Sequence, residues 1–212
     1  LFWHFRRNSS KLAIGNFNAR FGQGLALWNG MSLSGLAKPS SYLKRSSYLS
    51  PSHSFTGNYA FKGLATEINN GCLKITAMTA LNGLETDFGL LPAVNISCLL
   101  PYGQAGFTHY VQLDFAAEKI FVPDMKTACD FAFTIDGTDI FSEIAYDWRT
   151  ATAACLGGVV FPIGENLKMA AMLRYYPSGF RPTFSAAAHS LTKCSNEYGT
   201  SVSCEFSAGK WM

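Results

Sequence analysis

The chain has 212 residues, of which 48% are hydrophobic and only 15% are charged, and its formal net charge is +3. This small charge, with no Lys/Arg block denser than Phe5-Arg6-Arg7 or Lys44-Arg45, gives no reason to propose a nucleic-acid-binding surface. No stretch approaches the roughly 20 uninterrupted apolar residues of a membrane-spanning helix, so any membrane insertion has to use strands.

The two ends of the chain do not look like natural termini. The first residues, Leu-Phe-Trp-His-Phe-Arg-Arg, lack the order of a secretory signal, and residues 209–212 stop as another strand begins. We therefore expect residues 1–212 to form a single β-barrel segment of a longer protein, truncated at both ends.

The first third of the chain predicts one extended segment and one long loop. Residues 11–28 read as extended and include Gly22-Gln23-Gly24; a nucleotide-binding loop is disfavoured there because its third glycine is absent and no helix follows. Close packing of a neighbouring backbone or ring against these glycines is the favoured interpretation. Residues 32–54 are rich in Ser and Pro and have no period, which predicts a long loop outside the barrel or folded into its lumen.

The rest of the chain reads as strands joined by short turns. Asn69-Asn70-Gly71 and Asp136-Gly137 are signals of tight hairpins. The absence of helical period predicts an all-β fold, an antiparallel up-and-down meander that forms a transmembrane outer-membrane β-barrel, incomplete or open if the chain is a fragment. The expected strands are residues 57–68, 72–80, 90–100, 106–115, 128–135, 140–149, 151–163, 167–176 and 198–206.

Two strands show the expected two-sided pattern with particular clarity. In residues 167–175 an apolar face opposes Lys168 and Arg174, and in residues 198–206 Val202, Cys204 and Phe206 oppose two serines and Glu205. In a barrel wall the apolar face meets hydrocarbon and the polar face meets the lumen. The high aromatic content, with 17 Phe and 9 Tyr, fits the aromatic girdles of such barrels.

The polar faces supply the candidate site residues. We expect Glu143, Asp147, Lys168, Arg174 and Glu205 to face the lumen. Structural ion pairing among these charges is the favoured interpretation, and a solute-selective constriction or a catalytic role are the alternatives. No cofactor is implied, and the scattered histidines predict no metal site.

The six cysteines do not follow a metal-binding or redox spacing. Cys129 and Cys204 share the parity of apolar neighbours, as small apolar side chains on a lipid-facing wall would. A disulfide between Cys194 and Cys204, the closest pair in sequence, stays open because spacing cannot establish it.

Six short motifs occur in an order that resembles a known family. They are Gly15-Asn16-Phe17, Phe21-Gly22-Gln23-Gly24-Leu25, Phe61-Lys62-Gly63-Leu64-Ala65, Phe141-Ser142-Glu143-Ile144-Ala145, Arg174-Tyr175-Tyr176-Pro177 and Asn196-Glu197-Tyr198-Gly199. Together they resemble the C-terminal part of Bacteroides-type outer-membrane proteins known as helix-hairpin-helix domain-containing proteins. Lys62 and Ser142 depart from the Arg and Gly expected at their positions.

The resemblance implies a bacterial outer-membrane β-barrel in contact with lipid, whose helical domain is absent from these residues. We expect no nucleic-acid binding through this segment, because it contains no Gly-rich hairpin between helices. The expected partners are barrel strands from the missing parts of the same protein. The resemblance also implies structural roles for a set of motif residues: Gly22, Gln23, Gly24, Gly63, Asn196, Glu197 and Gly199.

We therefore expect a non-enzymatic outer-membrane barrel segment with a role in transport, scaffolding or surface assembly. One alternative is a soluble, secreted β-sandwich or barrel that binds glycans through Trp28, Trp148, Tyr175 and Tyr176. A further alternative is an outer-membrane hydrolase, for which Ser185, His189 and Asn196 are the nearest candidates in sequence.

Overall fold

The computed structural model describes residues 3–7, 9–29, 38–52, 60–82, 88–116, 119–120, 124–181, 183–189 and 194–207. Its strands form one antiparallel, up-and-down sheet, which confirms the predicted all-β meander. The sheet is not closed, because within the described residues the first strand does not pair with the last. It therefore has the form of an open or incomplete barrel.

Eleven strands lie along the path of the described sheet, and each pairs with its neighbour in the path. They are β1 (Trp3–Arg7), β2 (Ser10–Arg20), β4 (Phe61–Asn70), β5 (Leu73–Asn82), β6 (Phe88–Leu100), β7 (Gly103–Ala116), β9 (Asp124–Ile135), β10 (Thr138–Asp147), β11 (Thr152–Ile163), β12 (Leu167–Tyr176) and β13 (Glu197–Phe206). Two short strands lie beside this path: β3 (Tyr48–Pro51) pairs with β2, and β8 (Lys119–Ile120) pairs with β7. One 3₁₀ turn, η1 (Pro39–Ser41), precedes β3.

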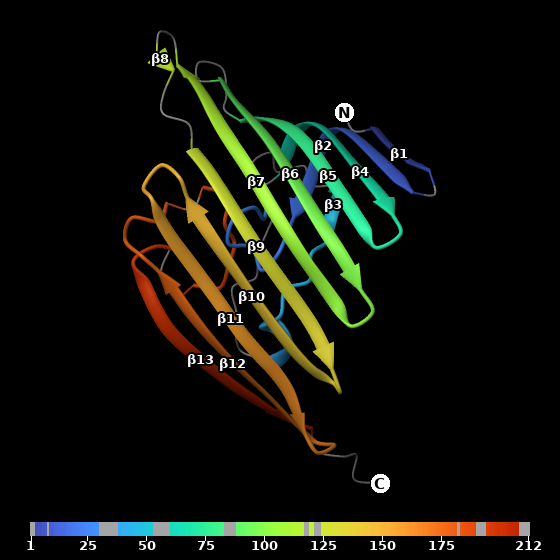
Figure 1. Cartoon of the computed structure of the whole chain (residues 1–212), viewed down its shortest axis with the longest axis vertical. Coiled ribbons are helices and arrows are strands. Elements are labelled where there is room, and N and C mark those ends of the chain that lie inside the picture. The colour runs from blue at the N-terminus through green and yellow to red at the C-terminus, as the bar shows by residue number, and fades with distance from the viewer. Residues whose placement is uncertain are drawn as a thin grey trace.

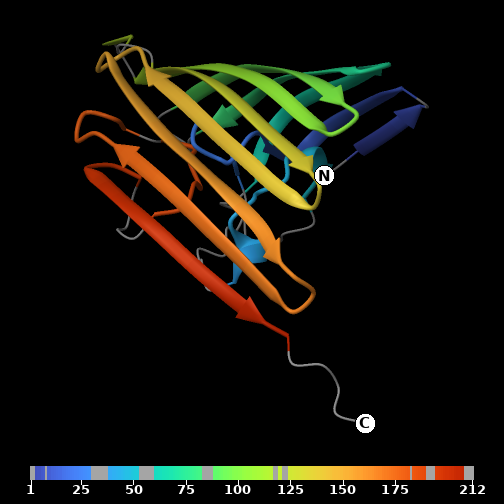
Figure 2. The ribbon, with the colours of Figure 1, turned by 60° about the horizontal axis from the view of Figure 1, so that its bottom comes forward.

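The sheet curves around the segments that connect its strands. Figure 1 shows the strands in one layer, and Figure 2 shows the connecting segments and η1 on the concave side of that layer. Side chains alternate between the two faces: Leu173 and Tyr175 are 65% and 54% exposed, whereas Arg174 and Tyr176 are 9% and 1% exposed. The convex face is therefore apolar and open, and the concave face is covered.

The strand β2 bends sharply into the concave side. Gly15 has a φ of 102°, a conformation that glycine adopts without steric cost. Beyond the bend, Phe17 and Ala19 are fully buried and the end of β2 pairs with β3. The Nζ of Lys11, from the other end of β2, lies 3.5 Å from the carbonyl oxygen of Leu49 in β3, so β3 has folded back over the inner face of the wall.

This bend explains why the prediction of an extended segment over residues 11–28 is wrong at its end. The strand stops at Arg20, and residues 21–28 form a compact turn in which Gly22 and Gly24 have φ values of 58° and 88°. Of the predicted loop 32–54, the described residues 38–52 include η1 and β3 and lie on the concave side. Residues 32–37, 53–59 and 208–212 lie outside the described residues.

The hydrophobic core lies between the concave face and these inward segments. Phe184 packs its ring against Phe61 of β4 and Tyr110 of β7, with ring centroids 5.5 and 5.6 Å apart. Phe17 adds a third ring, 6.0 Å from Phe61. Segments distant in sequence are thereby held together on the inner side of the sheet.

Candidate functional site: wall carboxylates and the plug

Three segments fill the concave side of the sheet. They are residues 21–29, residues 38–52 and the described residues of 177–195, and we call them the plug. The charged side chains that the wall directs inward lie against this plug. The candidate site is therefore the contact between wall carboxylates and plug backbone.

Glu143 of β10 binds the first plug segment through backbone amides. Its Oε2 accepts hydrogen bonds from the N–H groups of Gln23 and Leu25 at 2.6 and 3.0 Å, and its Oε1 accepts one from Ala26 at 3.1 Å. A Cβ on Gly22 would lie 2.7 Å from the same Oε2, so only glycine leaves room for the carboxylate. The turn at residues 21–26 thus forms a nest of N–H donors around one buried carboxyl group.

Gln23 joins the first plug segment to the second. Its Nε2 donates to the carbonyl of Lys44 at 3.0 Å, and its Oε1 accepts from the Lys44 N–H at 2.9 Å. The side-chain amide therefore replaces a backbone pairing between the two segments. Gly24 packs close to both Trp28 and Ala186, since its missing Cβ would lie 3.2 and 3.4 Å from them.

Glu67 of β4 fixes the second plug segment. Its Oε2 accepts a hydrogen bond from the Leu49 N–H at 3.1 Å, and its Oε1 lies 2.9 Å from the Nζ of Lys11 and 3.9 Å from the Nζ of Lys74. The ammonium group of Lys74 also lies 3.8 Å from the ring centroid of Tyr48. Because Glu67 is fully buried, these cations compensate a charge that would otherwise be costly inside the molecule.

Asp147 and Asp124 bind the third plug segment near the end of β10. The Nζ of Lys126 lies 3.5 Å from Asp147 and 2.5 Å from Asp124. Asp147 accepts a hydrogen bond from the Arg181 N–H at 3.2 Å, and Asp124 accepts one from the Thr183 hydroxyl. Each of the three plug segments is therefore bound by at least one inward carboxylate.

Arg174 and Glu197 join β12 to β13. The Nε of Arg174 lies 2.5 Å from Glu197, and its guanidinium also donates to the Ser201 hydroxyl. A Cβ on Gly199 would lie 3.2 Å from the Arg174 guanidinium, so the glycine makes room for this pair. Asn196, the residue before Glu197, has a φ of 52°, a turn conformation that asparagine tolerates better than most residues.

The predicted lumen-facing charges thus lie on the concave face but find different partners from those we expected. Glu143 and Asp147 are 2% and 0% exposed, and Lys168 and Glu205 occupy paired inward positions of β12 and β13. In the described residues, Glu143 binds plug amides, Asp147 lies beside Lys126, and Arg174 pairs with Glu197. None of these contacts joins two of the three predicted charges. A single charge ladder across the strands is not formed.

Several residues of the site were missed at the sequence level. They are Glu67, Asp124, Lys126 and Lys44. Glu67 and Lys126 have the inward parity of their strands, so alternation could have placed them on the polar face. Lys44 lies in a segment without period, and no sequence signal predicts its position.

The proposed hydrolase residues do not form a catalytic triad. The hydroxyl of Ser185 donates to the carbonyl of Gly24 at 2.9 Å, and the Nδ1 of His189 lies 2.7 Å from the carbonyl of Ala187. His189 also lies 3.5 Å from the Sγ of Cys194, but Cys194 is 1% exposed and burial raises the pKa of its thiol. The Ser185 and His189 side chains therefore form hydrogen bonds within the plug. The raised pKa of the Cys194 thiol opposes formation of a nucleophilic thiolate.

The four aromatic residues considered for glycan binding do not form one platform. Trp28 lies in the plug, where the Nζ of Lys44 is 5.2 Å from its ring centroid, and Tyr176 is buried on the concave face. Trp148 and Tyr175 are about half exposed on the convex face. The four side chains therefore lie on opposite sides of the sheet.

The six cysteines are free in the structure. Cys194 is buried in the plug while Cys204 is exposed on β13, so the closest pair in sequence is not bonded. Among the described residues there is no cluster of three or more His, Cys, Asp or Glu side chains arranged to hold a metal ion.

Comparison with protein-family models and with curated proteins gives no match. Within the part of the chain that the structure describes, no helix is both long and apolar enough to cross a membrane.

Proposed function

We propose that the chain is a non-enzymatic segment of a bacterial outer-membrane β-barrel, in which the sheet faces lipid and the plug closes the interior. Its role is that of a membrane scaffold for transport or surface assembly. The family resemblance of the six motifs supports the same location. The expected partners are outer-membrane lipid and further barrel strands of the same protein.

The observation that carries this proposal is the continuous apolar convex face. Every strand of the path from β2 to β13 contributes at least one exposed large apolar side chain; they include Ile14, Leu64, Leu81, Ile96, Phe107, Phe131, Ile144, Ile163, Leu173 and Val202. Scattered exposed apolar residues are normal in soluble proteins, but contiguous patches beyond a few hundred Å² are rare. A lipid environment gives this face a solvent in which its exposure is favourable.

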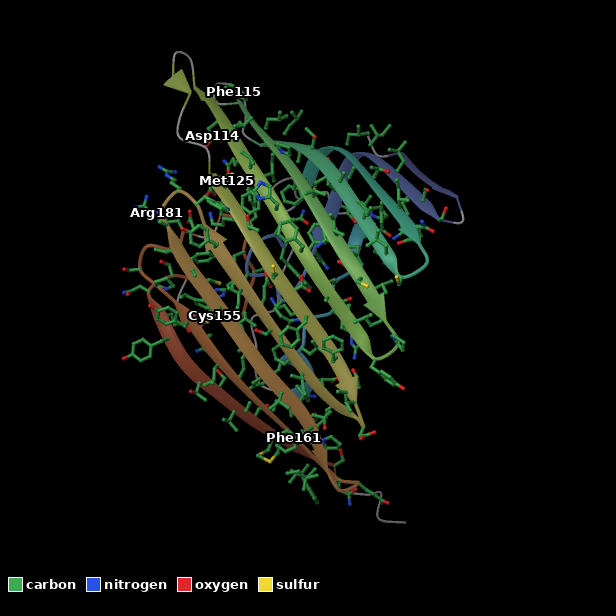
Figure 3. The ribbon with its side chains drawn as sticks, viewed as in Figure 1. Asp114, Phe115, Met125, Cys155, Phe161 and Arg181 are labelled. Carbon is green, nitrogen blue, oxygen red and sulfur yellow. The ribbon has the colours of Figure 1, made fainter. Side chains whose placement is uncertain are left out.

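Aromatic side chains near both ends of the strands add support. Trp148, Tyr175 and Tyr198 lie near the ends at which β10 and β12 finish and β13 begins, and Tyr102, Phe161 and Phe206 lie near the opposite ends. Figure 3 shows Phe115 and Phe161 far apart along the sheet. Aromatic girdles at the two interfaces are typical of membrane barrels.

The covered concave face argues for a closed interior over the described strands. Glu67, Glu143 and Asp147 are at most 2% exposed, and each accepts a hydrogen bond from plug backbone. A wide aqueous channel would leave such lumen charges in water. We therefore infer a scaffold or a gated transporter and not an open pore.

A pair of matched substitutions tests the lipid-facing role. Val202→Lys places a charge at the middle of β13, and Tyr102→Lys places the same charge in the turn between β6 and β7. In lipid vesicles Val202→Lys should lower the free energy of unfolding by about 2–4 kcal/mol, and Tyr102→Lys by about 0–1 kcal/mol. Both variants should be compared in purified outer membranes and in reconstituted vesicles.

A soluble protein would behave differently. Both side chains are already exposed, so in water both substitutions should change stability by no more than about 0.5 kcal/mol. Solubility without detergent, equal effects of the two substitutions and measurable oligosaccharide binding would together replace the membrane proposal with the glycan-binding one.

A further inference from the structure

One hollow on the convex face is shaped by small residues among large ones. It has a volume of about 530 Å³, and its lining is mostly apolar. Ser142, Gly157, Leu173 and Thr200 form one row across β10 to β13, and Ile144, Cys155, Tyr175 and Tyr198 form the next row. Ser142, Gly157 and Cys155 form the floor, and the larger side chains form the walls; we call this hollow the groove.

The walls of the groove are unusually exposed. Leu173, Tyr175 and Tyr198 are 65%, 54% and 86% exposed, and they stand beside a glycine that contributes no side chain. An elongated apolar group lying on Gly157 and Cys155 would have Ile144 of β10 on one side and Leu173 and Tyr175 of β12 on the other. An acyl chain has this shape and chemistry.

Two arginines lie at the nearest end of the same strands. The backbone N–H groups of Arg149 and Arg181 donate to the two oxygens of the same carboxylate, Asp147, at 3.0 and 3.2 Å. Both residues are exposed, and within the described residues neither side chain takes part in an ion pair. Asp147 thus holds the backbones of two exposed arginines at the same end of the sheet.

The spacing between the arginines and the groove fits a single lipid. Figure 3 places Cys155 between Arg181, near one end of the sheet, and Phe161, toward the other. Cys155 is the fourth residue of β11, so it lies about 10 Å along the strand from its start, or about 7 Å in depth for a strand tilted by about 45°. The headgroup region of a bilayer leaflet is about 5–7 Å thick.

We propose that the groove and the arginine pair bind one anionic, phosphate-bearing acylated lipid of the membrane. The phosphate lies at Arg149 and Arg181, and one acyl chain lies on Gly157 between Ile144 of β10 and Leu173 of β12. This inference rests on the proposed function, because it requires the convex face to lie in a bilayer.

The test measures lipid retained by the full-length protein in mild detergent, by native mass spectrometry. Delipidated protein is titrated with phosphatidylglycerol and with phosphatidylcholine carrying the same acyl chains. One tightly bound phosphatidylglycerol is expected, with weaker retention of the net-neutral lipid. Arg149→Glu should weaken phosphatidylglycerol binding about fivefold or more, as expected for a cation worth about 1 kcal/mol at a membrane surface.

Two further variants test whether the lipid binds in the groove or anywhere on the apolar wall. Gly157→Leu fills the groove and should lower retention of the lipid, whereas Val159→Leu, two residues along the same face of β11, should not. Lys62→Glu, an exposed charge on β4, is the control for Arg149→Glu.

The outcomes distinguish this inference from the proposed function. Equal binding of both lipids, or equal binding by wild type, Arg149→Glu and Gly157→Leu, in a protein that still inserts into membranes, would overturn the lipid site alone. A protein that never inserts would overturn both. Circular dichroism and outer-membrane fractionation of each variant show whether it has folded.

Discussion

At the level of single residues, the wall and the plug meet through carboxylates that accept hydrogen bonds from backbone N–H groups. Glu143 accepts three such bonds, and Glu67 and Asp147 each hold another plug segment in the same way. Hydrogen bonds to a charged acceptor contribute more than neutral ones, and a buried donor that loses its acceptor is costly. The inward carboxylates therefore have a structural reason to be buried.

Glu143→Ala tests this role directly. The substitution leaves three buried N–H groups without their acceptor, so we expect the free energy of unfolding to fall by at least about 3 kcal/mol. Glu143→Gln keeps one acceptor oxygen and should cost roughly half as much. Urea unfolding in detergent, followed by tryptophan fluorescence, measures both.

The control for this prediction is Glu165→Ala, the same change in the exposed turn between β11 and β12. It should alter stability by no more than about 0.5 kcal/mol. If Glu143→Ala changed the free energy of unfolding by as little as Glu165→Ala does, the Glu143 carboxylate would not hold the plug.

Lys44 predicts a pH dependence that originates in the plug. Burial lowers the pKa of its ammonium group from 10.5 to about 8. Below pH 8 the cost of burying the cation is fully present; between pH 8 and 10.5 the unfolded chain binds more protons, so stability rises with pH. The gain is at most about 3 kcal/mol and should disappear in Lys44→Met.

Cys194 acts in the opposite direction and has to be removed for that measurement. Burial raises the pKa of its thiol above 9.0, so the unfolded chain loses its proton first and stability falls as the pH rises past 9. Unfolding should therefore be measured from pH 7 to 11 in a Cys194→Ala background, with and without Lys44→Met. Identical slopes in the two proteins would contradict the assignment to Lys44.

At the level of elements, the bend in β2 lies beside a second glycine on the neighbouring strand β4. Gly15 of β2 pairs with Gly63 of β4, and a Cβ on Gly63 would lie 2.1 Å from the carbonyl oxygen of Thr79 in β5. No side-chain rotation can relieve a clash with backbone. The register between β4 and β5 would have to shift.

Gly63→Ala should therefore cost several times more than Gly71→Ala. Gly71 also has a positive φ, 60°, but a Cβ there would meet nothing within 4 Å, so its cost is limited to backbone strain of about 1–2 kcal/mol. Thermal unfolding of the two variants in the same detergent measures the difference. Similar melting temperatures would show that β4 and β5 can separate at this point without penalty.

These elements also show how far the sequence alone could lead. Alternation predicts the strands and the inward parity of Glu143 and Arg174, because a period of two is a local property of an extended chain. It does not predict that Glu143 binds the amides of Gln23, Leu25 and Ala26, since that contact joins segments more than 100 residues apart. The turn at residues 21–26 was expected to be a strand because its glycines and apolar residues fit either structure.

At the level of the whole molecule, the open sheet leaves two edges to be satisfied. Within the described residues β1 and β13 each have one strand neighbour, β2 and β12. In hydrocarbon an unpaired backbone N–H or carbonyl costs several kcal/mol, which is why membrane barrels close. The proposed location therefore requires that strands outside these residues, or a second copy, pair with β1 and β13.

Hydrogen exchange tests this requirement at the outer edge. In the full-length protein reconstituted into vesicles, the amides of β13 should exchange about as slowly as those of β12, since both strands would then have two neighbours. In the isolated 212-residue chain in detergent, β13 should exchange much faster than β12, because its outer edge faces solvent. The inner strand β12, paired on both sides by β11 and β13, is the internal control in each sample. Fast exchange of β13 beside a protected β12 in the reconstituted full-length protein would mean that the edge stays open there, and an open edge is incompatible with a wall that lies in lipid.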